Sequence, residues 1–324
     1  MSDAAGTALA PWQQRLYTQA ASAIDSGRLG HALLFRGPAL LGKGAVARAL
    51  ARRLLCESRD AAGNACGRCR GCQLFAAGTH PDFHDVSFIA TKDGSKVRTE
   101  LIVDQVRELS GQLSLTPQYG GAQVAIIDPA DALNHAAANA LLKTLEEPQP
   151  GRYLWLVAAD PARLPATIRS RCQNIEFRLP PRAEALAWLR AQGHDGRSGE
   201  DALDAARGHP GLAAAWLGDG GLALRKDVAS DLSALGRGEA SPAATAQRWA
   251  GDEHAALRLR FAADLALEQA AGLTDAGRTR RLASWFDAAN RTAALLRTTV
   301  RTDLAMAELL LAWPRTTGGK RSDE

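Results

Sequence analysis

Four cysteines lie close together in the order C-x9-C-x2-C-x2-C; they are Cys56, Cys66, Cys69 and Cys72. Four thiolates at these spacings suit a closed tetrahedral zinc site, which leaves no open position for a substrate and is therefore structural. A redox-active C-x2-C pair is the alternative, but such a pair needs neither a second C-x2-C nor a fourth cysteine. We therefore predict structural zinc, with Cys172 as a small buried residue outside the site.

Glycines and arginines are interspersed with these cysteines. Gly63, Gly67 and Gly71 are expected to permit the tight turns that aim the sulfur atoms inward. Arg68 and Arg70 are expected to offset part of the negative charge of a zinc ion bound by four thiolates.

A second motif, Gly37-x4-Gly42-Lys43, follows a strand-like run and precedes a helical pattern. This is the context of a phosphate loop, in which backbone amides and a helix N-terminus approach phosphate and the lysine contacts the β and γ oxygens. An ordinary strand–turn–helix connection is the alternative. A hydrolysing loop needs Ser or Thr after the lysine to bind magnesium. Because Gly44 stands there, the sequence argues against catalytic competence.

Alternating strand-like and helical patterns in the first half of the chain predict an α/β fold. Short apolar runs indicate buried strands at 31–35, 83–89, 123–128, 153–159 and 174–179. Helical patterns lie between them at 44–55, 101–113, 135–146 and 165–171. This alternation implies a parallel sheet with helices on both faces, and strands buried on both sides explain the continuous apolar runs.

The strand-like runs stop at Leu179, and Pro180-Pro181 marks a boundary. A short helical section follows, then a glycine-rich stretch at 218–221 that is typical of a linker, and the rest is helical in pattern. We therefore predict an α/β domain with the zinc module at 1–179, a small helical domain at 180–218 and a helical bundle at 219–324.

Length, charge and composition exclude only a few classes of protein. The chain has 324 residues and a formal net charge of +4, a mild excess that a solvated basic surface explains better than binding to nucleic acid does. We see no stretch of about 18 apolar residues that would span a membrane, and the first residues lack the pattern of a signal peptide. We therefore expect a cytoplasmic protein, in which five cysteines favour metal binding or burial over disulfides.

Two further segments, NALLKTLEEP at 139–148 and SRC at 170–172, carry a family resemblance. Together with a cysteine module between the phosphate-loop helix and the second strand, they resemble the clamp-loader subunits of bacterial DNA polymerase III, gamma/tau and delta-prime. The specific motifs cover Trp12 to about Trp216, and the remaining residues match only in being helical. The resemblance implies an AAA+ α/β domain, a small helical lid domain and an all-α collar domain for oligomerisation.

Departures from the family pattern indicate the type of subunit. Hydrolysing gamma-type subunits keep Ser or Thr after the loop lysine, Asp-Glu after the third strand, a threonine sensor after the fourth strand and an arginine sensor in the lid. In this chain Gly44 follows the loop lysine and Pro129 follows Asp128. Ala158 and Ala159 stand in place of the threonine sensor, and Gly211 stands in place of the arginine sensor. Four catalytic roles are lost while fold-defining residues remain, which looks like the delta-prime type. Binding of ATP or ADP through Gly37, Gly42 and Lys43, without hydrolysis, stays open.

The resemblance also implies a role for Arg171 and a set of partners. Arg171 would be an arginine finger offered to ATP on a neighbouring subunit, whereas by itself the segment only shows Arg169 and Arg171 complementing a helix C-terminal dipole. The partners would be gamma/tau and delta subunits, in a complex that opens the sliding clamp and places it on primed DNA. The chain would be a non-hydrolysing scaffold within the DNA polymerase holoenzyme.

Two other functions compete with the hypothesis of a non-hydrolysing scaffold. An active gamma/tau-like ATPase is the first, and a hydrolysis assay on the isolated chain separates it from a scaffold. A zinc-dependent nucleic-acid-binding module is the second. The cysteine segment lacks interleaved aromatic residues on which bases could stack, which weighs against that module.

Overall fold

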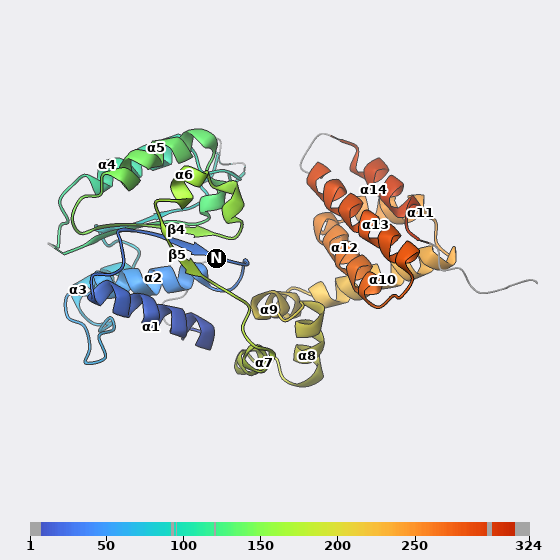
Figure 1. Ribbon diagram of the computed structural model, residues 1–324, viewed down its shortest axis with the longest axis horizontal. Coiled ribbons are helices and arrows are strands. Elements are labelled where there is room, and N and C mark those ends of the chain that lie inside the picture. The colour runs from blue at the N-terminus through green and yellow to red at the C-terminus, as the bar shows by residue number, and fades with distance from the viewer. Residues whose placement is uncertain (1–7, 92–93, 95, 120, 297–299, 315–324) are drawn as a thin grey trace, which may run out of the picture. The chain divides into compact units, whose positions relative to one another are not determined.

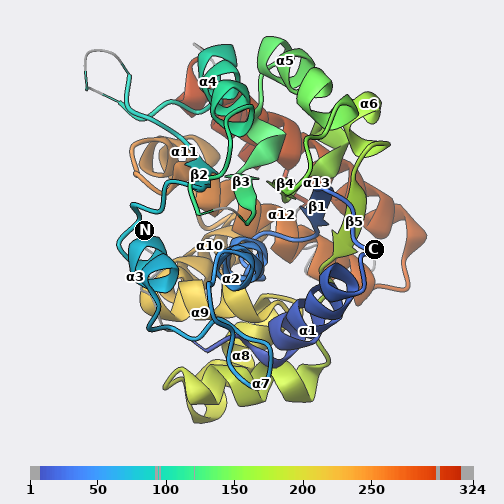
Figure 2. The ribbon, with the colours of Figure 1, turned by 90° about the vertical axis from the view of Figure 1, so that its left-hand side faces the viewer.

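The apolar runs of the first half form one parallel sheet of five strands in the computed structural model, which describes residues 8–91, 94, 96–119, 121–296 and 300–314. The strand order is β2-β3-β4-β1-β5 (Figure 2). The strands are β1 (Ala32–Arg36), β2 (Phe83–Val86), β3 (Gln123–Ile127), β4 (Arg152–Ala158) and β5 (Gln173–Glu176). Because the paired strands run parallel, the segments that follow β1, β3 and β4 all leave the same edge of the sheet.

Helices cover both faces of the sheet, as predicted (Figure 1). One face carries α1 (Pro11–Asp25), α2 (Lys43–Leu54) and α3 (Arg70–Ala76); the other carries α4 (Val103–Leu113), α5 (His135–Glu146) and α6 (Ala166–Arg169). Neighbouring strand residues point to opposite faces, so Phe35 packs in the core beneath α1 and α2 while Leu34 packs beneath α4 and α5. Both side chains are fully buried, which explains the unbroken apolar runs.

Several local features differ from the sequence-based expectation. Strand β5 ends at Glu176 rather than at residue 179. Helix α1 was not predicted, although Pro11 occupies the first helical turn, where proline is favoured. Strand β2 ends at Val86 rather than at residue 89. Helix α3 forms inside the cysteine module, where only turns were expected.

Helices make up the rest of the described chain. They are α7 (Arg182–Ala191), α8 (Gly196–Ala205), α9 (Pro210–Gly218), α10 (Gly221–Arg237), α11 (Pro242–Ala250), α12 (Ala255–Ala271), α13 (Ala276–Leu295) and α14 (Thr302–Leu311), while the 3-10 turns η1 (Ala130–Ala132) and η2 (Pro161–Arg163) lie in the sheet region. The chain divides into two compact units, Met1–Ala214 and Ala215–Glu324. The finer division at 179 and 218 stays a prediction. Within the described residues, none of the helices is both long enough and apolar enough to cross a membrane.

Candidate functional site

The four cysteines of the predicted metal site come together after α2. Cys56 follows that helix, Cys66 and Cys69 lie on the next loop, and Cys72 is in the first turn of α3. Their sulfur atoms all lie within 4.8 Å of one another, and Cys56 Sγ is 3.7 Å from Cys66 Sγ and 3.8 Å from Cys69 Sγ. A tetrahedral ion with Zn–S bonds of about 2.3 Å would set its sulfurs about 3.8 Å apart. The arrangement therefore fits a metal ion held by four thiolates.

Backbone amides of the same segment point at these sulfurs. The amide of Cys66 donates to Cys56 Sγ at 3.3 Å, that of Cys69 to Cys66 Sγ at 3.3 Å, and that of Cys72 to Cys69 Sγ at 3.4 Å. A hydrogen bond from the backbone of Arg68 is the main cause that lowers the pKa of Cys66 to about 6, whereas burial raises the pKa of Cys72 to about 12. Amide donors of this kind favour the charged thiolate, which is the form that binds metal.

Two of the three glycines in the module behave as predicted. Gly63 and Gly67 have φ of 77° and 75°, a left-handed conformation that glycine adopts at no steric cost. Gly71 does not form a turn, because it lies in α3 and a Cβ there would be 2.6 Å from the Leu55 carbonyl oxygen. Its small size instead lets α3 approach the end of α2, which brings Cys72 beside Cys56.

The predicted phosphate loop has the backbone that such a loop needs. Gly37 (φ 134°) follows β1, and Gly42 (φ 79°) is the N-cap of α2, so both adopt conformations that favour glycine. The Lys43 ammonium is buried and donates to the carbonyl oxygens of Gly37 at 2.9 Å and Pro38 at 2.7 Å. Burial lowers the pKa of Lys43. The lysine is thus bonded to its own loop.

Helix α1 holds this loop from outside, through residues that sequence reasoning missed. Trp12 Nε1 and Gln13 Nε2 each donate to the Leu41 carbonyl oxygen at 3.1 Å. A Cβ on Gly42 would overlap the Gln13 amide. The only sequence signal for this support was the Pro-Trp start of a helix next to an apolar pattern.

The residues around Gly44 do not fit a magnesium ion. Gly44 offers no side-chain oxygen, and a Cβ there would lie 2.5 Å from Asp128 Oδ2 and 2.7 Å from Arg48 NH1. The space beside Asp128 therefore holds a guanidinium. Burial raises the pKa of Asp128, an effect that the positive charge of Arg48 only partly opposes.

The other positions of the predicted degenerate catalytic set lie nearby along the same strand edge. Pro129 follows β3 and Ala158 ends β4. Asp131 accepts hydrogen bonds from the backbone amides of Ala159 at 3.1 Å and Asp160 at 2.8 Å, and so fixes the segment after β4. Gly211, at the start of α9, packs so closely on the Leu40 carbonyl of the phosphate loop that a Cβ would overlap it.

Arg171 lies two residues beyond the end of α6, after the C-cap Ser170, whereas the sequence predicted it in the last helical turn. Its NH2 is 2.7 Å from Glu146 Oε1, and its NH1 donates to the Thr167 carbonyl at 2.9 Å. The side chains of Arg171 and Glu146 are 37% and 49% exposed, so the pair is open to water. Glu146 ends α5, whose N-cap Asn134 accepts from the Ala137 amide at 2.9 Å.

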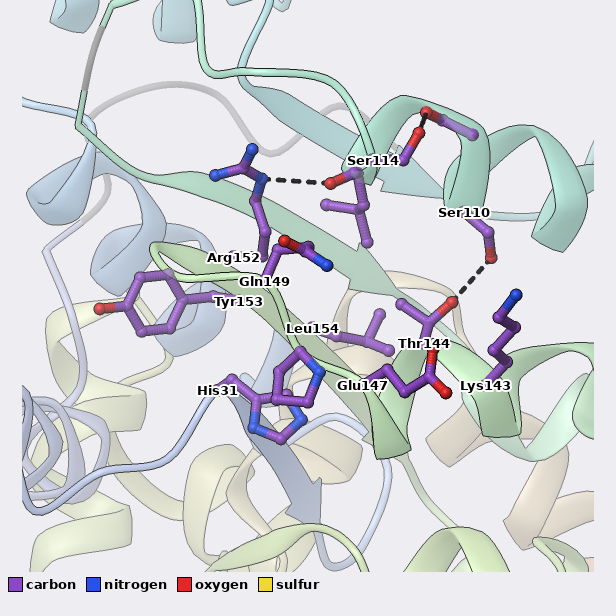
Figure 3. A pocket seen from close by; sticks show the side chains of 13 residues that line it. His31, Ser110, Ser114, Lys143, Thr144, Glu147, Gln149, Arg152, Tyr153 and Leu154 are labelled. Atoms are coloured by element: carbon purple, nitrogen blue, oxygen red, sulfur yellow. Dashed lines mark hydrogen bonds between the residues drawn. The ribbon is translucent and has the colours of Figure 1, made fainter.

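A pocket of about 410 Å³ lies at the opposite ends of the strands, where β4 begins (Figure 3). Its wall includes Lys143 and Thr144 of the NALLKTLEEP segment. Several of its polar groups already have partners: Ser110 Oγ and Thr144 Oγ1 are 2.9 Å apart, and Arg152 Nε donates to the Leu113 carbonyl at 3.1 Å. These contacts tie α4 to α5 and to the sheet.

Comparisons with known proteins agree with the resemblance. The family model described as "DNA polymerase III, delta subunit" matches residues 12–181, just over half of the chain. The DNA polymerase III subunit delta' of Pseudomonas aeruginosa is 45% identical over 55% of this chain and 52% of its own length. That of Haemophilus influenzae is 37% identical over 68% and 65%.

A gamma/tau subunit is also similar. The DNA polymerase III subunit gamma/tau of Mycobacterium bovis is 34% identical over 59% of this chain and 32% of its own length. The chain thus spans between half and two thirds of the delta' relatives and a third of the gamma/tau relative. The chain belongs to the DNA polymerase III, delta subunit family, with similarity to delta' subunits and a relation to gamma/tau subunits.

Proposed function

We propose that this chain is a delta-prime type clamp-loader subunit, a non-hydrolysing scaffold of AAA+ architecture. The observation that carries the proposal is the phosphate loop, which keeps Gly37, Gly42 and Lys43 but has Gly44 and Arg48 where magnesium would be handled. A motor subunit needs that ion to neutralise the charge that develops on the phosphates. Similarity to delta' subunits over 55% and 68% of the chain supports the same choice.

The four-cysteine module would hold zinc in this subunit. The sulfur separations of 3.7 and 3.8 Å and the three amide donors support zinc over a redox pair. Bound zinc would supply a rigid cross-link between four thiolates and no reactive position. The module would then fix the loop between α2 and α3.

Arg171 would act in trans, on ATP bound by a neighbouring subunit. Support comes from its place just beyond the C-cap of α6, the 37% exposure of its side chain and its position in the SRC segment that carries the resemblance. A guanidinium is always charged and can contact two phosphate oxygens in one plane. Such a group stabilises the charge of a phosphoryl-transfer transition state.

The partners would be gamma/tau and delta subunits, the sliding clamp and, through the complex, primed DNA. The helices of the second unit would form the collar for oligomerisation, α7 to α9 would form the lid, and the protein would act in the cytoplasm. Nucleotide binding without hydrolysis is part of this proposal.

Reconstitution tests the proposal directly. Gamma/tau and delta subunits are mixed with and without this chain, and loading of labelled clamp onto primed DNA is measured. We expect loading only when the chain is present, and no ATP turnover by the chain alone. Loading that is equal in its absence, or turnover by the isolated chain that Lys43→Ala removes, would point to the gamma/tau-like ATPase instead.

A further inference from the structure

Three charged side chains, Arg48, Asp85 and Asp128, meet beside the phosphate loop. The sequence analysis named Asp128 but did not connect it with the other two. Arg48 lies one turn after Gly44 on α2, so both residues face the same side of the helix. Its Nε and NH2 donate to Asp85 Oδ2 at 3.2 and 2.9 Å, and its NH1 is 3.7 Å from Asp128 Oδ2. One guanidinium therefore bridges a carboxylate of β2 and the carboxylate of the residue that follows β3.

The pairing of these strands explains why the two carboxylates converge. Asp85 is opposite Ile126 in the register of β2 and β3. Asp128 is two residues beyond Ile126, so its side chain points to the same face as that of Asp85. The side chains of Arg48, Asp85 and Asp128 are 28%, 33% and 27% exposed, which places the cluster half-buried beneath the loop.

The Arg48 guanidinium lies where the hydroxyl that binds magnesium would stand in a working phosphate loop. A side chain on residue 44 would begin 2.7 Å from Arg48 NH1 and 2.5 Å from Asp128 Oδ2. In a working loop the hydroxyl at this position and the acid after the third strand hold the ion between them. Here Arg48 fills that space and carries positive charge to the same acid.

We propose that Arg48 is a built-in replacement for magnesium, and that it excludes divalent cations from the phosphate loop. The inference extends the proposed function, because it names the residue that sets the cation specificity of the degenerate site. Phosphate-bearing ligands that reach Lys43 would bind there without a divalent ion. The neighbouring charges are Lys43 and Asp131, so removal of Arg48 leaves three carboxylates facing one ammonium.

The test measures Mn²⁺ binding to the zinc-loaded full chain by electron paramagnetic resonance, in the absence of nucleotide and of partner subunits. Arg48→Met keeps most of the apolar stem and removes the charge. The wild type should take up no Mn²⁺ at this site, and Arg48→Met should gain about one ion per chain through carboxylate oxygens. The double variant Arg48→Met with Asp128→Asn should lose that ion again.

Two control variants test whether the positive charge at position 48 is what excludes Mn²⁺. Arg48→Lys keeps a cation beside Asp128 and should still exclude Mn²⁺, and Arg52→Met removes another α2 arginine and should leave Mn²⁺ binding unchanged. A wild type that binds Mn²⁺ as Arg48→Met does, or a folded Arg48→Met that gains none, overturns the proposal.

Folding itself is a second readout. If Arg48→Met unfolds, recovery of its circular dichroism on addition of Mn²⁺ supports the proposal, and failure to recover contradicts it. The measurements need no clamp, ATP or partner subunit. The proposed clamp-loader function and the proposed exclusion of divalent ions can therefore fail independently of each other.

Discussion

Replacement of Arg171 by alanine gives a sharp test of action in trans, because its local contacts are weak. Its ion pair with Glu146 is 37% and 49% exposed, and exposed pairs contribute about 0–1 kcal/mol. Release of Arg171 from Glu146 therefore costs at most about 1 kcal/mol, roughly a fivefold change in an equilibrium. Arg171→Ala also removes the exposed hydrogen bond to the Thr167 carbonyl, so it should lower the free energy of unfolding of the subunit by no more than about 2 kcal/mol.

The effect on the assembled complex should be larger. An arginine finger changes the rate at the site it serves by about 10³–10⁵ in GTPases. The loss measured on the whole complex should be much smaller, since we expect only one of several ATP sites to depend on this subunit. The assay is DNA-stimulated ATPase and clamp loading by the reconstituted complex, with zinc content and assembly measured in parallel. Arg171→Ala should lower both activities and leave zinc and assembly intact.

Two matched variants identify the cause. Glu146→Gln removes the same ion pair but keeps Arg171, so it should leave ATPase activity close to that of the wild type. Arg169→Ala removes an exposed arginine of α6 and should likewise have little effect. If Glu146→Gln lowers activity as much as Arg171→Ala, or if Arg171→Ala blocks assembly, the reasoning is refuted and Arg171 is structural.

Three other expectations concern the metal, the fifth cysteine and hydrolysis. Elemental analysis should find about one zinc per chain. Cys69→Ser should lose the zinc, while the serine oxygen still caps α3 as Cys69 Sγ does from the N-cap position. Absence of zinc from protein that was purified without a chelator would contradict this prediction. Burial raises the pKa of Cys172 from its ordinary 9.0 to about 11, so the folded state holds that proton more tightly. The stability contribution of Cys172 is present below pH 9 and is lost as pH rises toward 11, so Cys172→Ala should flatten that part of a pH–stability curve, and an unchanged curve would exclude the effect. Gly44→Thr should not produce ATP turnover, because Pro129 and both alanines remain and the new side chain meets Arg48 and Asp128; phosphate release above background would show otherwise.

Local patterns in the sequence were enough to predict the central strands and the cysteine cluster. Strands β1, β3 and β4 are apolar runs, whereas the edge strands β2 and β5 contain polar residues. The four cysteine sulfurs lie within 4.8 Å of one another, because all four residues belong to one short segment. The pairing of Arg48 with Asp85 and Asp128 could not be predicted in the same way. Its partners lie in β2 and directly after β3, and the register of these two strands is set by long-range packing.

Two other contacts were hidden for similar reasons. Lys43 was expected to point at phosphate, but its buried ammonium bonds to Gly37 and Pro38 because an ammonium out of water needs acceptors. Arg171 was expected to face a neighbour, and its pair with Glu146 depends on how α6 lies beside α5. Neither partner can be read from spacing along the chain.

The position of β4 in the sheet has a consequence for folding during synthesis. Strand β4 lies between β3 and β1, and its last residue, Ala158, is made long after β1 and β3. A ribosome that has released only the first 150 residues therefore exposes the β2–β3 pair and a separate β1 strand, because both partners of β1, β4 and β5, are still to be made. The cysteine segment, by contrast, is complete at Cys72, and its contacts are local. Metal capture can thus precede closure of the sheet, and a nascent chain stalled before Ala158 should already hold its ion while remaining prone to aggregate.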